Sequence, residues 1–284
     1  MTANRKTSVL LGLALLAGVT ASAQPSIVPG GVLNAASFAK NAQGQGTPVA
    51  PGSLVAIFGS NLGSTQADAD SVPFSTQLGG VSTSFGANAG RMRDVIPAAG
   101  IINVQVPFEA QAGTTVNTIV TVNGAQSLPA PVQIVAQAPG IFSVPPGAGY
   151  ALVFNLSNFS LAAPASLSSQ LGLTSAAIPR STAATASFAF FYATGLGAMD
   201  PPVNDGDAGL DGVAHKCVNT PTVTLGGISV PVLFAGQAAG FPGVYQVNIQ
   251  IPANAPTGDA VDMQIMSADG TQLSPAGVVH IAIQ

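Results

Sequence analysis

Three aspartates close together in the second half of the chain are the best candidates for a functional site. Asp205, Asp207 and Asp211 lie in the segment Asp205-Gly-Asp-Ala-Gly-Leu-Asp-Gly212. Carboxylates at positions 1, 3 and 7 of a glycine-containing loop are hard oxygen ligands that suit calcium. An EF-hand loop would carry an acidic residue at position 12, where this sequence has Lys216. The segment is therefore a candidate calcium site, but the favoured interpretation is a polar loop whose aspartates cap turns.

Residues for catalysis are scarce. His215 and Cys217 lie two positions apart, but no Gly-x-Ser-x-Gly or cysteine-protease motif surrounds them. His280 lies in an alternating strand pattern that is typical of an outward-facing side chain. The single glutamate, Glu109, gives no carboxylate pair for glycoside hydrolysis. We therefore expect a protein that is not an enzyme and that needs no organic cofactor.

The composition indicates the kind of fold that must position these residues. Charged residues make up 6% of the 284 residues and hydrophobic residues 47%, which excludes an intrinsically disordered chain. The formal net charge is -4 and no basic cluster occurs, so nucleic acid is not an expected partner. The 33 glycines and 22 prolines favour turns over long helices. We predict an all-β fold of many short strands.

The first 23 residues have the pattern of a cleaved signal peptide. Arg5 and Lys6 precede an apolar stretch over residues 9–19, and Ala21-Ser-Ala23 is typical of a cleavage site. The apolar stretch is well short of the roughly 20 residues that span a bilayer. The sequence thus predicts a secreted or cell-surface protein that starts near Gln24 and has no transmembrane segment in the mature chain.

The chain contains an internal repeat. Leu54–Gly63 recurs as Phe188–Gly197 at an offset of 134, and Asn103-Val-Gln-Val-Pro107 recurs as Asn248-Ile-Gln-Ile-Pro252 at an offset of 145. The pair Gly79-Gly80 matches Gly226-Gly227 at an offset of 147, which predicts a loop 13 residues longer in the second copy, over residues 198–221. Apolar residues alternate with Asn and Gln in these motifs, as in strands with one buried face.

The turns between strands define two β-sandwich domains. Asn123-Gly124 and Asp269-Gly270 are typical of tight hairpin turns. We predict a first sandwich over residues 31–142, a linker that starts the second domain over 143–185, and a second sandwich over 186–284. A short helix is expected around residues 165–173.

Several motifs resemble a known family. Pro51-Gly-Ser-Leu-Val-Ala-Ile-Phe-Gly-Ser-Asn-Leu62, Ala138-Pro-Gly-Ile-Phe142, Tyr192-Ala-Thr-Gly-Leu-Gly197 and Gly243-Val-Tyr-Gln-Val-Asn-Ile-Gln-Ile-Pro252 are similar to the Solibacter-type uncharacterised C-terminal domain family of exported bacterial proteins. The strand that ends in Gly-Ser-Asn-Leu is also similar to the opening strand of IPT/TIG immunoglobulin-like domains. The resemblance implies two tandem immunoglobulin-like sandwiches in an extracellular setting, and it implies no catalytic residues.

Three functions remain open. The favoured hypothesis is a non-enzymatic structural or interaction module that binds an extracellular protein or a cell-envelope component, or associates with itself through open strand edges. The alternative is a module that binds cell-surface polysaccharide, with possible help from calcium. Such a module would present aromatic platforms, but Trp is absent, and Tyr192 and Tyr245 fall in strand patterns that predict burial. A hydrolase is the least favoured.

Overall fold

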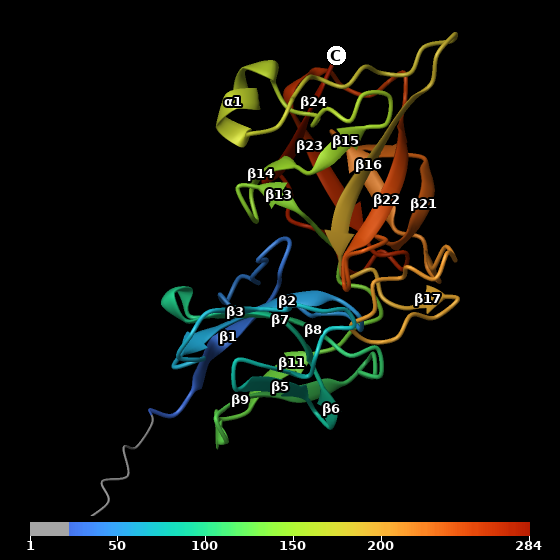
Figure 1. Cartoon of the computed structure of the whole chain (residues 1–284). Coiled ribbons are helices and arrows are strands. Elements are labelled where there is room, and N and C mark those ends of the chain that lie inside the picture. The colour runs from blue at the N-terminus through green and yellow to red at the C-terminus, as the bar shows by residue number, and fades with distance from the viewer. Residues whose placement is uncertain (1–22) are drawn as a thin grey trace, which may run out of the picture.

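The computed structural model describes residues 23–284 as two β-sandwich domains stacked end to end (Figure 1). The predicted signal peptide lies almost entirely outside the described residues. Within residues 23–284, no helix is long and apolar enough to cross a membrane. The elements of the first domain are β1 (Ser26–Asn34), β2 (Leu54–Ser60), β3 (Ala67–Asp68), β4 (Gln77–Leu78), β5 (Val81–Phe85), β6 (Asn88–Ala89), β7 (Arg91–Ile96), the 3-10 helix η1 (Pro97–Ala99), β8 (Ile101–Gln105), β9 (Thr115–Val122), β10 (Ala125–Gln126) and β11 (Ala130–Gln133).

The second domain follows directly and ends with the last strand of the chain. Its elements are β12 (Gly140–Ile141), β13 (Ser143–Val144), β14 (Gly149–Ala151), β15 (Val153–Asn155), the 3-10 helix η2 (Ala165–Leu167), α1 (Ser168–Leu171), β16 (Ser187–Thr194), β17 (Met199–Asp200), β18 (Lys216–Cys217), β19 (Thr222–Leu225), β20 (Ile228–Val230), β21 (Val232–Gln237), β22 (Tyr245–Ile251), β23 (Gly258–Met266) and β24 (Val279–Ile283). The helical turns η2 and α1 confirm the predicted short helix.

Each domain consists of two facing sheets. In the first domain the order β1-β2-β8-β7-β3 faces β10-β9-β5-β4, and in the second β12-β16-β22-β21-β18-β17 faces β13-β14-β24-β23-β19-β20. Strand β22 shows how the sequence produces this layering, since Tyr245, Val247, Ile249 and Ile251 are fully buried and the residues between them are not. Each domain has its own apolar core. The prediction of an all-β chain with two tandem immunoglobulin-like sandwiches is confirmed.

The segment 143–185, predicted as a linker that starts the second domain, pairs with strands of the second sandwich. Strand β14 pairs with the final strand β24, and β15 pairs with β16. Ala151, Val153 and Ile178 from this segment are fully buried in the second core. The second sandwich therefore begins with β12 near residue 140, and the first begins with β1 at Ser26, earlier than the predicted residue 31.

The two domains have equivalent hairpins that fix the register of the repeat. Ser127 Oγ accepts a hydrogen bond from the N–H of Val120 at 3.0 Å, and Ser274 Oγ accepts one from the N–H of Ile265 at 2.9 Å. Val120 lies opposite Thr83, and Ile265 lies opposite Val223.

This register corrects the predicted alignment of the two Gly-Gly pairs. Val120 and Ile265 are equivalent, so the residues opposite them, Thr83 and Val223, are equivalent as well. The offset between the copies at this strand is therefore 140, and Gly226 matches Gly86, not Gly79. The loop over residues 198–221 is therefore longer by 6 residues than its counterpart, since the preceding offset is 134. The prediction of 13 was wrong because a Gly-Gly pair is a common turn element and was matched to the wrong turn.

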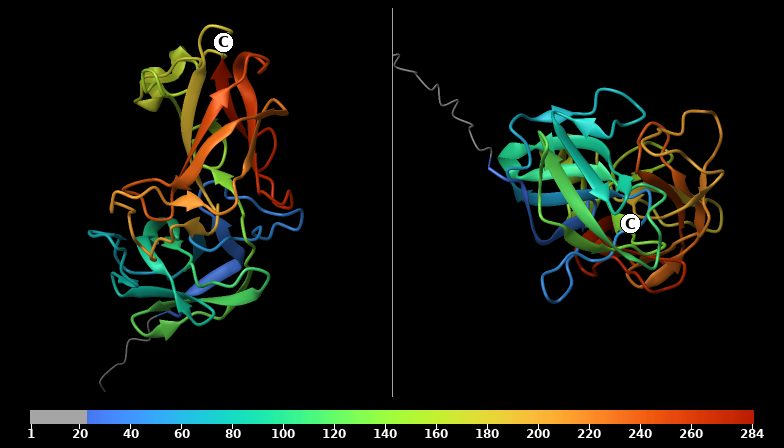
Figure 2. Two further views of the ribbon diagram at one scale, coloured as in Figure 1. Left: turned by 90° about the vertical axis from the view of Figure 1, so that its right-hand side faces the viewer. Right: turned by 90° about the horizontal axis from the view of Figure 1, so that it is seen from below.

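The first domain presents the outer face of its β2 and β8 strands to the second domain (Figure 1). Figure 2 shows the two stacked domains in two further views. Leu54 donates its N–H to Thr194 Oγ1 at 2.8 Å, and Gly206 donates its N–H to Gln105 Oε1 at 2.6 Å. Gly243, at φ 73°, approaches Leu54 so closely that an added Cβ would lie 2.8 Å from its Cγ. Backbone and side chains thus hold the domains together by specific contacts.

Candidate functional site

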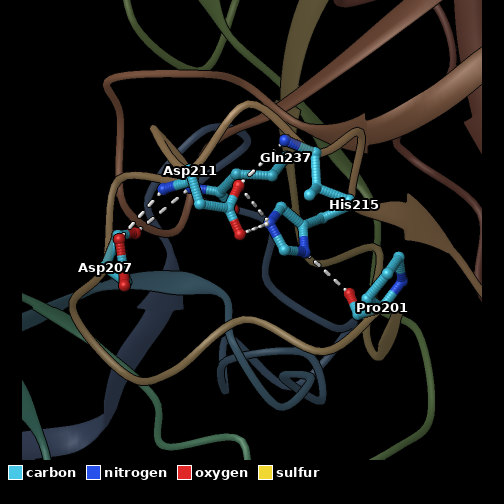
Figure 3. Close-up of polar contacts among 7 residues, drawn as sticks. Pro201, Asp207, Asp211, His215 and Gln237 are labelled. Carbon is cyan, nitrogen blue, oxygen red and sulfur yellow. Dashed lines mark hydrogen bonds and ion pairs between the residues drawn. The ribbon is translucent and has the colours of Figure 1, made fainter.

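The predicted aspartate site lies in the loop between β17 and β18 (Figure 3). Asp205, at its start, contacts the first domain, because its Oδ1 accepts a hydrogen bond from the N–H of Phe108 at 2.8 Å. The Phe108 side chain in turn packs against the core of the second domain. Burial raises the pKa of the Asp205 carboxyl, the Phe108 N–H lowers it, and the neighbouring Glu109 carboxyl raises it again. Asp205 is therefore a domain-interface residue.

The other two aspartates bind different partners. Asp207 Oδ1 accepts from the N–H of Gly209 at 3.1 Å. Asp211 lies 3.1 Å from the ring nitrogen Nε2 of His215 and accepts from the N–H of Val213. Among residues 23–284, no group of three or more His, Cys, Asp or Glu side chains is placed to hold a metal ion. The three aspartates do not converge in this structure, and the calcium hypothesis stays a prediction.

The segment between β17 and β18 is called here the aspartate loop. Near its end, His215 contacts Pro201 and Asp211 of the same loop. The ring is buried, with Nδ1 at 2.8 Å from the carbonyl oxygen of Pro201 and Nε2 facing Asp211. Both partners are acceptors, so both ring nitrogens satisfy them only when both carry protons. The Pro201 carbonyl and, to a smaller extent, Asp211 raise the pKa of His215, while burial lowers it.

The geometry gives Cys217 no role as a nucleophile. Its side chain is buried, and burial raises the pKa of the thiol to about 12. A nucleophilic cysteine needs a lowered pKa, usually from an adjacent base. His215 is the nearest base in sequence, but both of its ring nitrogens contact other groups.

A row of aromatic side chains lies on the outer face of the second domain. Phe190 stacks on Phe154 at a centroid distance of 5.4 Å, and edge contacts join it to Phe159 at 6.3 Å and Tyr192 at 5.8 Å. Tyr192 contacts Phe241 at 6.1 Å. Phe159 and Phe241 are 67% and 55% exposed, and the others are half-buried. These five residues form one continuous strip, called here the aromatic row.

A row of amides runs beside the aromatic row on strand β22. Gln246 lies directly opposite Tyr192, Asn248 opposite Phe190, and Gln250 opposite Phe188. Gln246 Nε2 donates to Asn248 Oδ1 at 2.8 Å, so these two amides orient each other. Gln246, Asn248 and Gln250 are called here the amide row. The outer face thus offers flat apolar rings with donors and acceptors along one side.

The sequence-based prediction for Tyr192 was wrong, whereas that for Tyr245 is confirmed. Tyr245 is fully buried and donates its hydroxyl to the carbonyl oxygen of Gly197 at 2.6 Å. Tyr192 lies half-buried on the outer face. The sequence held the relevant signal, because Phe188, Phe190 and Tyr192 alternate with small residues and Phe191, which face inward.

The aromatic row ends at a hollow between the two domains. Three depressions of about 170, 270 and 330 Å³ adjoin there, and Val244 lines all three. Tyr192 and Phe241 line the smallest, which joins the hollow to the aromatic row. Arg93 of the first domain lines the two larger depressions. The three depressions together are called here the interdomain groove.

Comparisons with known proteins give no family for the chain. No family model matches it, and no curated protein matches it. Among solved structures it is similar to the surface glycan-binding protein SGBP-B of the Bacteroides ovatus mixed-linkage glucan utilization locus, in complex with a mixed-linkage heptasaccharide. The identity is 12%, the TM-score 0.31, and the match covers 83% of this chain and 44% of that one.

Two further solved structures are similar at the same level. The surface glycan-binding protein PbSGBP-B of Prevotella bryantii has 11% identity and a TM-score of 0.25, over 89% of this chain and 42% of that one. The I9–I11 tandem of titin has 8% identity and a TM-score of 0.21, over 82% and 62%. The chain spans less than half the length of the two glycan-binding proteins. At these TM-scores the likenesses carry no weight for function.

Proposed function

We propose that this protein is a non-catalytic, extracellular polysaccharide-binding module whose binding face is the outer sheet of the second domain. The observation that carries the proposal is the aromatic row beside the amide row on one open sheet face. This corresponds to the alternative hypothesis from the sequence. The family resemblance and an extracellular protein or envelope partner stay predictions.

The chemistry of the face matches that of a sugar chain. A pyranose ring has an apolar face of C–H groups and a rim of hydroxyls. Aromatic rings carry a negative face that attracts such C–H groups and are well suited to flat contacts. Amides both donate and accept hydrogen bonds, so Gln246, Asn248 and Gln250 can bind sugar hydroxyls as donors or as acceptors.

The chemistry of the described side chains favours a binding module over an enzyme. Beside the Tyr192 hydroxyl, the polar groups described on the face are the amides of Gln246, Asn248 and Gln250, which neither give nor take protons at neutral pH. The titratable residues of the aspartate loop bind backbone groups or one another, as Asp205 does with Phe108 and Asp211 with His215. The aspartate loop connects the two domains, and the outer sheet of the second domain is the proposed polysaccharide-binding face.

The proposal is tested by binding to a panel of soluble polysaccharides, measured by affinity electrophoresis and calorimetry. Phe190→Ala and Tyr192→Ala each remove one ring from the row, and we expect each to lose about 1–1.5 kcal/mol, or roughly tenfold in Kd. The matched control is Leu128→Ala, a 77% exposed apolar residue of the first domain, and it should bind as the original protein does. The proposal is wrong if no polysaccharide binds, or if the ring variants bind as tightly as the control.

A further inference from the structure

The interdomain groove continues the aromatic row across the domain boundary. Phe241 belongs to the aromatic row and also lines two of the three depressions. Phe142 and Leu152 of the second domain connect the smallest depression to the largest, which reaches Phe38 of the first domain. A ligand that leaves the aromatic row at Tyr192 therefore enters a hollow whose largest part, about 330 Å³, is of the size of small-molecule sites.

The charged residues at the groove are one arginine and two aspartates, so carboxylates are in excess. The Arg93 guanidinium pairs with the Asp94 carboxylate, and Asn103 donates to the other Asp94 oxygen at 2.7 Å. Asp68 also lines the groove beside Arg93, which leaves this part with more negative than positive charge. The whole chain carries a formal net charge of -4. A sugar chain with carboxylate groups would meet repulsion here, whereas an uncharged chain would not.

The groove is held open by contacts that do not depend on a ligand. Thr194 binds Leu54 across the boundary at 2.8 Å and also donates to the carbonyl oxygen of Gly243, next to Val244, at 2.7 Å. Phe74, which lines the depression of about 270 Å³, donates its N–H to the carbonyl oxygen of Gly206 at 2.9 Å. A preformed site avoids the cost of ordering two domains on binding.

We propose that the ligand is an uncharged, extended polysaccharide that lies along the aromatic row and continues into the interdomain groove, so that both domains bind one chain. This inference rests on the proposed function and names its substrate class. It follows that affinity rises with chain length until the ligand spans both parts. It also follows that affinity depends little on salt, because no net charge is neutralised on binding.

The test measures Kd for neutral oligosaccharides of increasing length, and for uronic acid oligosaccharides of the same lengths, at low and high salt. We expect long neutral chains to bind roughly tenfold more tightly than short ones. Val244 lines all three depressions and Ala35 lines the largest, so Val244→Trp and Ala35→Trp place an indole in the groove from the second and the first domain respectively. In both variants the ratio of short-chain to long-chain Kd should fall to about 1. Leu128→Ala should keep the full ratio, and thermal melts report whether each variant folds.

The outcomes separate this inference from the proposed function. If Phe190→Ala weakens binding of every length but both folded groove variants keep the full length dependence, the function stands and the inference is wrong. Tighter binding of uronic acid chains than of neutral chains would also overturn it. If no oligosaccharide binds the original protein, both proposals are wrong.

Discussion

Two buried threonines are expected to respond in opposite ways to the same substitution. Thr194 and Thr118 are both fully buried in strands. Thr194 Oγ1 accepts from the N–H of Leu54 and donates to the carbonyl oxygen of Gly243. Thr118 Oγ1 has no hydrogen-bond partner within residues 23–284. Replacement by valine keeps the side-chain shape and removes the hydroxyl in each case.

The expected magnitudes follow from the hydrogen bonds lost. Thr194→Val leaves one N–H and one carbonyl without a partner, at about 1–3 kcal/mol each. The buried methyl that replaces the hydroxyl stabilises the folded state by about 0.8 kcal/mol. We expect the free energy of unfolding to fall by about 1–5 kcal/mol. Thr118→Val removes an unpaired buried hydroxyl and should raise the free energy of unfolding by about 1 kcal/mol.

Urea unfolding followed by far-ultraviolet circular dichroism measures both effects, because the chain has no Trp to report by fluorescence. Two domains can unfold in two steps, so each transition is fitted separately. Unfolding free energies that change in the same direction in both variants would refute the reasoning. A change below about 0.5 kcal/mol in Thr194→Val would refute it as well, since that is the size of an ordinary surface substitution.

Two further predictions concern the aspartate loop. The folded-state pKa of His215 is raised, so its contribution to stability is complete below about pH 6.5 and is lost as pH rises through the folded-state pKa. Thermal melts between about pH 6 and pH 9 should therefore show a loss of stability that His215→Gln lacks, and parallel curves for both proteins would contradict this. Cys217, with its buried thiol and a pKa of about 12, should not react with a thiol reagent at pH 8 until urea unfolds the second domain, whereas fast labelling of the native protein would show that the thiol is accessible.

The sequence predicted the strands and the repeat because both depend on local patterns. The Asn103-Val-Gln-Val and Asn248-Ile-Gln-Ile motifs alternate as strands β8 and β22 require. Asn123 and Gly124 adopt positive φ angles of 48° and 86° in the hairpin between β9 and β10, as predicted for that turn. Such features need only a few consecutive residues to be recognised.

The candidate site could not be predicted in the same way, because it depends on contacts between distant residues. Asp205 binds the N–H of Phe108, 97 positions away, and nothing near either residue signals this pairing. The aromatic row joins Phe159 to Phe190 and Tyr192 to Phe241 across different strands and loops. Alternation in β16 predicts which residues share a face, but not which of the two faces stays open.

The outer face of β2 and β8 in the first domain is equivalent to the outer face of β16 and β22 in the second, but the two faces differ in exposure. Leu54 and Gln105 of the first copy correspond to Phe188 and Gln250 of the second. The first pair is buried under Gly243 and Gly206, whereas Phe188 is 37% exposed. A bulky residue at position 54 should therefore force the domains apart, while the same change at position 188 should be tolerated. The same surface of the repeat is therefore a contact between domains in the first copy and open to solvent in the second.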